Sequence, residues 1–499
     1  MNNWIKVVSL ILVFAILLCG AVSCASPDDN GGDGGTGEGE WDGSREDAPD
    51  NLPEDLYYDG ATVSVLYREH LKEYEAEGEA GSDIVYQAVF ERNARVESRL
   101  GVKFEWYPTE NSSPAPVRTE IVNVLGAFVD DYDYILTTNN TILSSGMNPY
   151  LWEFNYAPYI ELSQPWWWMD CIEALSFDGK TYNFLTGEMN LFNFMTMSAF
   201  YFNTSLLSTR LGLTADDMYE KVDGGTWTLD ELHRLVSKCY YDWNGNNVSD
   251  SGDIFGMPIA GNETINQLAF STKFDICERT PVGTVELKMN NDRAIRVCEK
   301  LTKLLHENNG VYDQEPINGS SGFDTFVIDD FTEGKYVFMA QRFTAACAQS
   351  MREMEDNYGI IPYPTLDEGD EYVSYIQPAS TCVSVPYAVD EERFERACAV
   401  LEALASEAYR SVTEKFYEYA LKSKYVRDDH GSPRMIDIIY NTSTKYFLWE
   451  YNSEANNIMG IFSSAIEGKQ SVATLYEQYG QAAENAVNKF IVECIEAYR

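Results

Sequence analysis

The sequence predicts an α/β fold in which a largely parallel sheet is covered by helices. Strand and helix patterns alternate in the order β-α-β-α-β between residues 61 and 138, which is typical of that arrangement. Hydrophobic residues make up 45% of the 499-residue chain, which is enough for a sizeable core. A chain of this length indicates two or more domains, or one large two-lobed body.

Each element of the alternating region has its own signal. Residues 61–67 are rich in β-branched side chains and predict the first strand. Residues 83–100 carry apolar side chains on one helical face and stop at Gly101, which predicts a helix. Alternating apolar residues at 102–106 predict the second strand, and a helix near 117–128 and a strand at 132–138 complete the unit.

Later elements are marked by caps and by helical periodicity. Thr228 and Glu231 have the spacing of a capping box and predict a helix start. Residues 382–387 predict a short strand, followed by a long helix with an apolar face between 394 and 408. From about residue 410 to the end the sequence is mostly helical in pattern, and it shows no internal repeat.

The first residues predict a secretory signal. Residues 1–23 combine Lys6, an apolar run at 7–18 and small residues directly before Cys24. The run is too short for a hydrocarbon core of about 30 Å, which needs about 20 residues. Its end resembles the bacterial lipoprotein processing site, where the cysteine thiol takes a diacylglycerol; the alternative is a plain signal peptide with Cys24 incidental. We expect lipid anchoring at Cys24 on the extracellular face of the cell membrane.

The next segment predicts a flexible tether. Residues 24–55 are rich in Gly, Asp and Glu and have almost no apolar content. Such a segment cannot bury enough surface to fold, and its like charges repel one another.

Charge and motifs exclude several classes of function. The formal net charge of −43 argues against nucleic acid or an anionic membrane surface as a partner, and favours neutral or cationic ligands. The four histidines form no zinc-protease pattern, and there is no nucleophile elbow, P-loop or dinucleotide-binding fingerprint. We therefore predict that the protein is not an enzyme.

Several stretches occur in an order that resembles one known family. They are 83–93 with 100–102, 159–167, 202–206, 225–232, 333–335 and 358–362. Together they resemble the extracellular solute-binding proteins of ABC importers, in the class that includes maltose-binding protein. The resemblance implies a two-lobed periplasmic-binding-protein-like fold with hinge strands and a helical C-terminal segment, in a monomer that delivers its ligand to a membrane permease.

The resemblance also places the lobe boundaries. Lobe one would comprise 56–200 and 376–412, and lobe two would comprise 201–375 and 413–499. A ligand would be enclosed between the lobes. Since both lobes then contribute contacts, closing the hinge would expel water from the cleft.

Aromatic and amide side chains are candidates for sugar contacts. Trp166 and Trp167 lie in a run of three tryptophans and could supply an aromatic platform, although tryptophans are often simply buried. Asn139 and Asn140 follow a predicted strand, and open α/β sheets bind ligands at the carboxyl ends of strands. The alternative for the two asparagines is a turn cap.

Three further candidates follow from the resemblance alone. Thr196 lies just before the first crossover between the lobes, and Arg342 and Phe343 follow a predicted strand at 336–340. In this family both regions border the cleft. The alternative for Arg342 is a surface ion pair.

One loop has the spacing of a calcium site. Oxygen donors fall at loop positions 1, 3, 5, 7, 9 and 12, supplied by Asp242, Asn244, Asn246, Val248 through its carbonyl, Asp250 and Asp253. Asn247 stands where such loops usually have Gly, and Asp253 stands where they usually have Glu. The pattern fits either a structural Ca²⁺ site or a metal-free polar turn, and no other cofactor is predicted.

These observations predict a membrane-anchored extracellular substrate-binding subunit of an ABC importer. Its ligand would be a small molecule, a sugar or oligosaccharide, captured without chemistry. Two alternatives stay open at this point: an exported glycoside hydrolase, and a helical glycan-capture surface lipoprotein.

Overall fold

The structure is a computed structural model that describes residues 44–497 apart from 82, 113, 144–147, 260, 275, 282, 314–322 and 418–430. The predicted signal peptide, the lipidation site at Cys24 and the first part of the predicted tether lie outside the described residues. Within the described part of the chain, no helix is long and apolar enough to cross a membrane.

The first sheet has four strands in the order β12-β3-β1-β2, and it forms the centre of what we call lobe one. β1 (Ala61–Tyr67) pairs in parallel with β2 (Val102–Pro108) and with β3 (Tyr134–Thr138). β12 (Thr381–Ser384) returns much later in the sequence and runs antiparallel to β3. The predicted alternation and the largely parallel pairing are confirmed.

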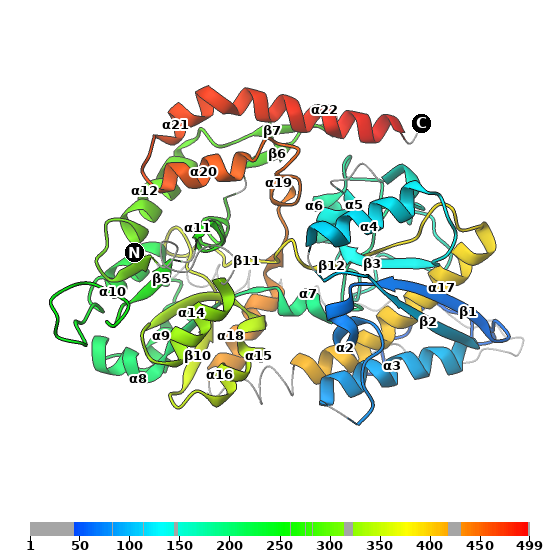
Figure 1. Ribbon diagram of the computed structural model, residues 1–499, viewed down its shortest axis with the longest axis horizontal. Helices are drawn as coiled ribbons and strands as arrows, with labels where there is room; N and C mark the ends of the chain where they lie inside the picture. Colours follow the sequence, from blue (N-terminus) through cyan, green and yellow to red (C-terminus); the bar gives the residue numbers. More distant parts are fainter. Residues whose placement is uncertain are drawn as a thin grey trace, which may run out of the picture. The chain divides into compact units, whose positions relative to one another are not determined.

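Helices cover both faces of this sheet (Figure 1). α4 (Pro114–Gly126) lies on one side, and α3 (Ile84–Leu100) lies with α17 (Glu391–Glu407) on the other. Asp83 caps α3 by accepting a hydrogen bond from an amide of its first turn, and Gly101 ends it with φ 62°. A left-handed residue at this place is most easily supplied by glycine, so the predicted helix stop is confirmed.

The second sheet has three antiparallel strands and forms the centre of what we call lobe two. β4 (Ser198–Asn203) lies between β9 (Phe338–Arg342) and β10 (Tyr358–Ile361), and every residue of the three strands is buried. β4 pairs in this sheet from its first residue. The lobe boundary predicted after residue 200 therefore falls inside a strand.

A buried tryptophan joins this sheet to a neighbouring helix. Trp227 is fully enclosed, and its ring packs on Phe200 and Phe338. Thr228 caps α10 (Leu229–Val236) by accepting a hydrogen bond from a first-turn amide at 3.2 Å. The helix start predicted from the threonine spacing is confirmed.

Three chain segments between the two sheets lie side by side and are called the hinge segments here. β11 (Ser374–Tyr375) pairs in parallel with β13 (Ser443–Thr444). Met197 bridges Ile376 in antiparallel fashion, and the Ile376 amide donates to the carbonyl of Thr444 at 2.9 Å. Strands in this position agree with the predicted hinge.

The rest of lobe two is built from helices and short strand pairs. Its two-stranded sheets are β5 (Met257–Ile259) with β8 (Val311–Asp313) and β6 (Cys277–Arg279) with β7 (Val285–Leu287). Its helices before residue 360 are α8 (Thr204–Leu206), η3 (Leu207–Leu211), α9 (Ala215–Asp223), α11 (Gly261–Phe270), α12 (Asp292–Leu305), α14 (Phe323–Thr332), α15 (Phe343–Cys347) and α16 (Gln349–Glu353).

Short helical turns connect the elements of lobe one, and helices dominate the described C-terminal residues. The turns are η1 (Glu69–Leu71), α2 (Lys72–Glu75), α5 (Asn139–Leu143), η2 (Asn148–Tyr150), α6 (Met169–Leu175) and α7 (Leu191–Met195). The C-terminal helices are η4 (Ala408–Val412), α18 (Ser432–Asn441), α19 (Phe447–Glu450), α20 (Ile458–Ile466), α21 (Val472–Leu475), η6 (Tyr476–Gly480) and α22 (Gln481–Ala497).

The last part of the predicted tether is packed, and we call residues 44–52 the N-terminal strap. Ala48 and Leu52 belong to the core and are 2% and 6% exposed. The Asp50 carboxylate accepts two hydrogen bonds from the Arg99 guanidinium, at 2.6 and 2.8 Å. The prediction of a flexible segment up to residue 55 is therefore wrong for the strap. Although its average composition is polar, two buried apolar side chains and one ion pair hold it against lobe one.

Candidate ligand-binding site

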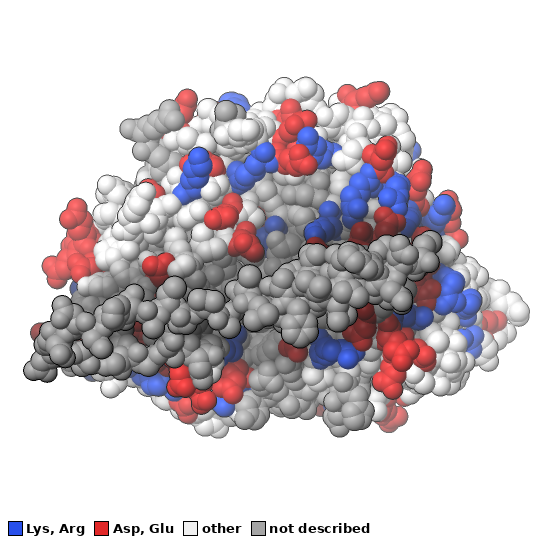
Figure 2. All heavy atoms as spheres, turned by 180° about the vertical axis from the view of Figure 1, so that it is seen from behind, with Lys and Arg blue, Asp and Glu red and all other residues white. Residues whose placement is uncertain are grey.

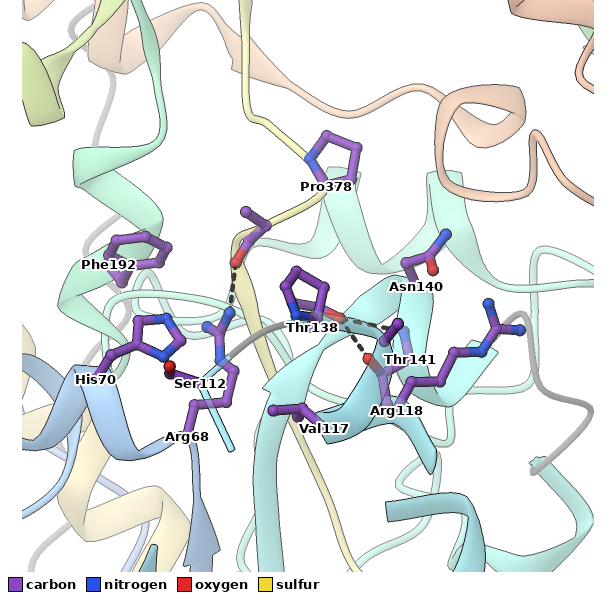
Figure 3. Close-up of a pocket in the computed structure, with 13 residues that line it drawn as sticks. Arg68, His70, Ser112, Val117, Arg118, Thr138, Asn140, Thr141, Phe192 and Pro378 are labelled. Atoms are coloured by element: carbon purple, nitrogen blue, oxygen red, sulfur yellow. Dashed lines mark hydrogen bonds between the residues drawn. The ribbon is translucent and has the colours of Figure 1, made fainter. Parts of the chain in front are cut away.

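A pocket of about 570 Å³ lies at the carboxyl edge of the lobe-one sheet (Figure 3). Its size is typical of small-molecule sites. It is lined by Arg68, His70, Ser112, Pro114, Ala115, Val117, Arg118, Thr138, Asn140, Thr141, Phe192, Pro378 and Ala379. In open α/β sheets ligands bind outside the carboxyl ends of the strands, so this pocket occupies the expected position.

Parallel pairing explains how distant segments meet there. Arg68 and His70 follow β1, while Thr138 ends β3 and Asn140 begins α5. Because β1 and β3 are parallel neighbours, their carboxyl ends share one edge. The pocket is completed by the start of α4, by α7 and by the hinge segment at residues 378–379.

Hydroxyl and amide groups lie together on one part of the pocket wall. The Thr138 and Thr141 hydroxyl oxygens are 2.8 Å apart, and the Thr141 amide donates to the Thr138 hydroxyl at 3.1 Å. The Asn140 side-chain amide donates to the Glu450 carbonyl at 2.7 Å, which fixes the direction of the Asn140 side chain. Such groups donate and accept hydrogen bonds, as recognition of sugar hydroxyls requires.

Arg68 joins the pocket to the hinge. Its guanidinium is buried, donates to the Ala379 carbonyl at 2.9 Å and to the Thr381 hydroxyl, and lies 3.9 Å from the Glu75 carboxylate. Burial lowers the pKa of Arg68, and the charge of Glu75 opposes that effect. Burial also raises the pKa of the Glu75 carboxyl, with Arg68 opposing. The pair is thus held inside the protein.

Lobe two carries a set of mutually bonded polar side chains near the hinge, which we call the amide network. The Glu263 carboxylate accepts from the side-chain amides of Gln267 at 2.7 Å and Gln377 at 2.5 Å. Arg342 donates to the Gln377 side-chain oxygen, and the Tyr363 hydroxyl donates to that of Gln267. The network joins α11, β9 and the hinge segment that follows β11.

The structure separates the predicted polar contacts into two groups. Asn140 lines the pocket, whereas its neighbour Asn139 is fully buried. The side-chain oxygen and nitrogen of Asn139 have no hydrogen-bond partner among the described residues. Thr196 is buried, and its backbone carbonyl accepts from the Gln377 amide at 3.2 Å. Asn140 therefore lies in the pocket wall, and Thr196 lies at the hinge.

Arg342 and Phe343 also belong to the hinge region and do not line the pocket. Arg342 is 8% exposed and donates to Gln377, so the surface-ion-pair alternative is wrong. Phe343 is 1% exposed, and its amide donates to the Met197 carbonyl at 3.1 Å. Both residues help to join β9 to the hinge segments.

The predicted aromatic platform is corrected by the structure. Trp166 and Trp167 are 0% and 4% exposed and lie in the core. The Trp166 ring packs edge-on against Tyr409, and the Trp167 indole donates to the Glu402 carboxylate at 3.0 Å. Neither ring lines the pocket, because both stabilise the interior of lobe one.

Four residues that line the pocket are not predicted from the sequence: Arg68, His70, Arg118 and Phe192. The first two directly follow the β1 strand, so the rule that selected Asn139 and Asn140 after β3 also applies to them. Arg118 and Phe192 come from α4 and α7. No local sequence signal marks these two, because only the tertiary arrangement brings them to the pocket.

In the calcium-like loop, side-chain oxygens accept hydrogen bonds from backbone amides of the same loop. Asp242 accepts from the amides of Gly245 at 2.7 Å and Asn247 at 2.9 Å, and Asn246 accepts from the Val248 amide at 2.7 Å. Asn247 has φ 59°. The left-handed conformation required at position 6 is thus adopted by asparagine, which tolerates it better than most residues.

The remaining ligand candidates of this loop are engaged by side chains. Asp250 accepts from the amides of Asn244 at 3.0 Å and Asn246 at 2.7 Å. Asp253 is 1% exposed and accepts from the Tyr240 hydroxyl at 3.1 Å. Within the described residues there is no cluster of three or more His, Cys, Asp or Glu side chains able to hold a metal ion. Calcium binding here stays a prediction.

No model of a protein family matches the sequence, and no curated protein is significantly similar to it. Solved structures, however, share its fold. The maltose-binding periplasmic protein of Listeria monocytogenes, in complex with maltose, is 15% identical with a TM-score of 0.57, and the match covers 87% of this chain and 99% of that one.

Two further structures show the same fold with other ligands. An ABC substrate-binding protein of Listeria monocytogenes in complex with cycloalternan is 11% identical, with a TM-score of 0.54 over 87% of this chain and 99% of that one. UgpB of Mycobacterium tuberculosis in complex with glycerophosphocholine is 11% identical, with a TM-score of 0.55 over 87% and 100%. This chain therefore has the two-lobed α/β fold of maltose-binding proteins, and the fold alone does not specify a ligand.

Proposed function

We propose that this protein is the substrate-binding subunit of an ABC importer and captures a carbohydrate between its two lobes. The observation that carries the proposal is the pocket at the carboxyl edge of lobe one, bordered by a hinge segment, in a fold shared with sugar-binding proteins. A ligand held there stabilises the closed arrangement to the extent that it binds it better than the open one.

The proposal includes export and a lipid anchor at Cys24. A receptor tethered in this way would meet its permease by lateral diffusion in the membrane. Labelling of intact cells with a radioactive fatty acid tests this part. We expect incorporation into the natural protein and none into Cys24→Ala; equal labelling of both would contradict the anchor.

Binding without chemistry separates this function from a glycoside hydrolase. A saccharide at a hundred times its dissociation constant adds about 2.7 kcal/mol of stability, which a thermal-shift screen detects. The same mixtures are then assayed for new reducing ends. We expect stabilisation with no new ends, and catalytic turnover would overturn the proposal.

The second alternative, a nearly all-helical glycan-capture lipoprotein, disagrees with the fold. Lobe one is built on a four-stranded sheet and lobe two on a three-stranded one. The lobe-one sheet supplies the edge on which the pocket lies, and a helical scaffold has no such edge.

A further inference from the structure

The N-terminal strap is fixed to lobe one by several polar contacts. Near its end, the Asp50 carboxylate accepts a hydrogen bond from Arg410 at 3.2 Å, in addition to the two from Arg99. Arg410 also donates to the Ala48 carbonyl at 2.7 Å. Arg99 lies on α3 and Arg410 lies on η4, so the strap contacts two helical elements of lobe one. These contacts also restrict the position of the residues before Ala48.

The first part of the strap carries Arg45, which lies against the ring of a buried tyrosine. The guanidinium carbon of Arg45 is 3.8 Å from the centre of the Tyr409 ring, and its Nε donates to the Tyr409 carbonyl at 3.4 Å. Tyr409 is buried and packs against Trp166 of the lobe-one core. Because an aromatic face attracts a cation, this contact holds the Arg45 guanidinium against lobe one, where it also reaches Glu188.

Arg45 neutralises a carboxylate that is closed off from solvent. The Arg45 guanidinium donates to Glu188, whose side chain is 0% exposed. On the face drawn in Figure 2, by contrast, acidic and basic side chains lie interspersed at the surface. Surface ion pairs contribute little to stability, whereas a buried charge that loses its partner is costly. Burial raises the pKa of the Glu188 carboxyl, and the charge of Arg45 opposes that effect.

Glu188 also joins the two lobes. Its backbone amide donates to the Trp166 carbonyl at 3.0 Å, so Glu188 belongs to lobe one. Its second carboxylate oxygen accepts from the hydroxyl of Tyr440, which lies on α18. α18 belongs to lobe two, because its Ser432 hydroxyl accepts from the Ile360 amide of β10 at 3.0 Å. One buried carboxylate therefore connects the strap with lobe two.

This connection lies next to the hinge segments. β13 begins at Ser443, shortly after Tyr440 in the chain. The Tyr440 ring stacks on Phe194 of α7, with 5.6 Å between the ring centres, and Phe194 lies just before the hinge residue Met197. A rotation of the lobes about the hinge segments therefore moves Tyr440 relative to Glu188.

We propose that the N-terminal strap sets the resting angle between the two lobes. Arg45 keeps the Glu188 carboxylate charged and enclosed, and in this state Glu188 holds Tyr440 of lobe two. Without Arg45, a rotation of lobe two away from Glu188 lets water reach the carboxylate, so the equilibrium shifts toward other lobe arrangements. The inference goes beyond the proposed function and needs no ligand. Its failure would leave the proposed function standing.

The test measures the distance between the lobes in single molecules of the full-length protein in detergent. Two fluorophores for energy transfer are attached through non-natural amino acids at Lys103 on β2 and at Lys238 after α10, both of which are exposed. In Arg45→Met we expect at least about a tenfold rise in the population with a changed distance, because a buried carboxylate without its counter-charge strongly disfavours the enclosed arrangement.

Further variants assign the effect to the shared carboxylate. Adding Glu188→Gln to Arg45→Met should restore the natural distances, because the amide oxygen still accepts from Tyr440 and carries no charge. Tyr440→Phe keeps the ring and removes the hydroxyl, so it should shift the distances in the same direction as Arg45→Met. Arg434→Gln is the matched control on α18: its side chain is 55% exposed and pairs with Asp223, and the distances should stay unchanged.

Each outcome decides the inference. A shift in both single variants that Glu188→Gln reverses in the Arg45→Met background supports it. Natural distances in Arg45→Met and in Tyr440→Phe overturn it, and so does a shift in Arg45→Met that Glu188→Gln fails to reverse. Should Arg45→Met not fold, Arg45→Gln takes its place under the same criteria, since it removes the charge and keeps a donor for Glu188.

Discussion

The pocket of lobe one and the amide network of lobe two are both polar and lie next to the hinge, yet they use their polar groups differently. Thr138, Thr141 and Asn140 line a pocket with room for a ligand. Glu263, Gln267 and Gln377 bond to one another. The difference teaches that polar composition alone does not identify a binding surface: in lobe two the polar groups join the segments near the hinge, and in lobe one they line a pocket.

The largest expected effect comes from replacing Arg68, which lines the pocket and also donates a hydrogen bond to the hinge segment at Ala379. Arg68→Met leaves the buried Glu75 without its counter-charge, and we expect a loss of about 3–5 kcal/mol in the free energy of unfolding. Urea unfolding followed by tryptophan fluorescence measures it. Adding Glu75→Gln should recover most of the loss. A single variant as stable as the natural protein would show that the pair is unimportant.

The next largest effect is on the pH dependence of stability. It comes from Glu402, which lies in the interior of lobe one, away from the pocket and the amide network. Burial raises the pKa of Glu402 to about 7, with the hydrogen bond from Trp167 opposing. Because its pKa in the folded state is above the unfolded value, its contribution to stability is full below about pH 4.5 and is lost as the pH rises through 7. This shift corresponds to about 3 kcal/mol.

Glu402→Gln should remove that pH dependence. We expect the variant to be more stable than the natural protein at pH 8 and similar to it at pH 5, as judged from thermal unfolding across this range. Parallel stability profiles of the two proteins would contradict the assignment.

A pair of variants separates recognition from hinge stability. Glu263→Ala leaves the buried amide of Gln267 without its acceptor, so it should cost about 1–3 kcal/mol of stability with little direct effect on sugar contacts. Asn140→Ala should weaken sugar binding by about 0.5–1.5 kcal/mol and affect stability less. Calorimetric titration and thermal unfolding of both variants test this. A loss of sugar affinity in Glu263→Ala together with a loss of stability in Asn140→Ala would contradict this assignment of roles.

The smallest expected effect is that of calcium. Extracellular calcium modules bind with dissociation constants of about 10⁻⁴–10⁻³ M, and calcium at ten times that value would add about 1.4 kcal/mol. We expect a thermal shift of the natural protein with millimolar calcium and none with Asp242→Ala. No shift in either protein would favour the metal-free polar turn. In both cases sugar affinity should stay unchanged.

Prediction from sequence succeeded where the pattern is local. β1 has a clear strand pattern, and α3 has an apolar face with a cap at each end. Both elements form where they were expected. It failed where burial depends on distant partners. Trp166 and Trp167 are enclosed by α17 and η4 from more than 200 residues away, which no local pattern reveals. The strap was missed because Ala48 and Leu52 are few among many polar residues.

The candidate site was predicted only in part, because some of its residues follow from the strand pattern and others depend on tertiary packing. Asn140 was found because it follows a strand of the parallel sheet, and this position follows from topology. Arg118 was not found, because its approach to the pocket depends on how α4 packs across the sheet.

The central claim is that the protein binds a saccharide and releases it unchanged. Equilibrium dialysis of the full-length protein against a panel of neutral and acidic saccharides, with mass analysis of the retained sugar, tests it directly. The account predicts saturable retention of one intact molecule per protein chain. Retention of none, or recovery of cleaved sugar, would contradict it.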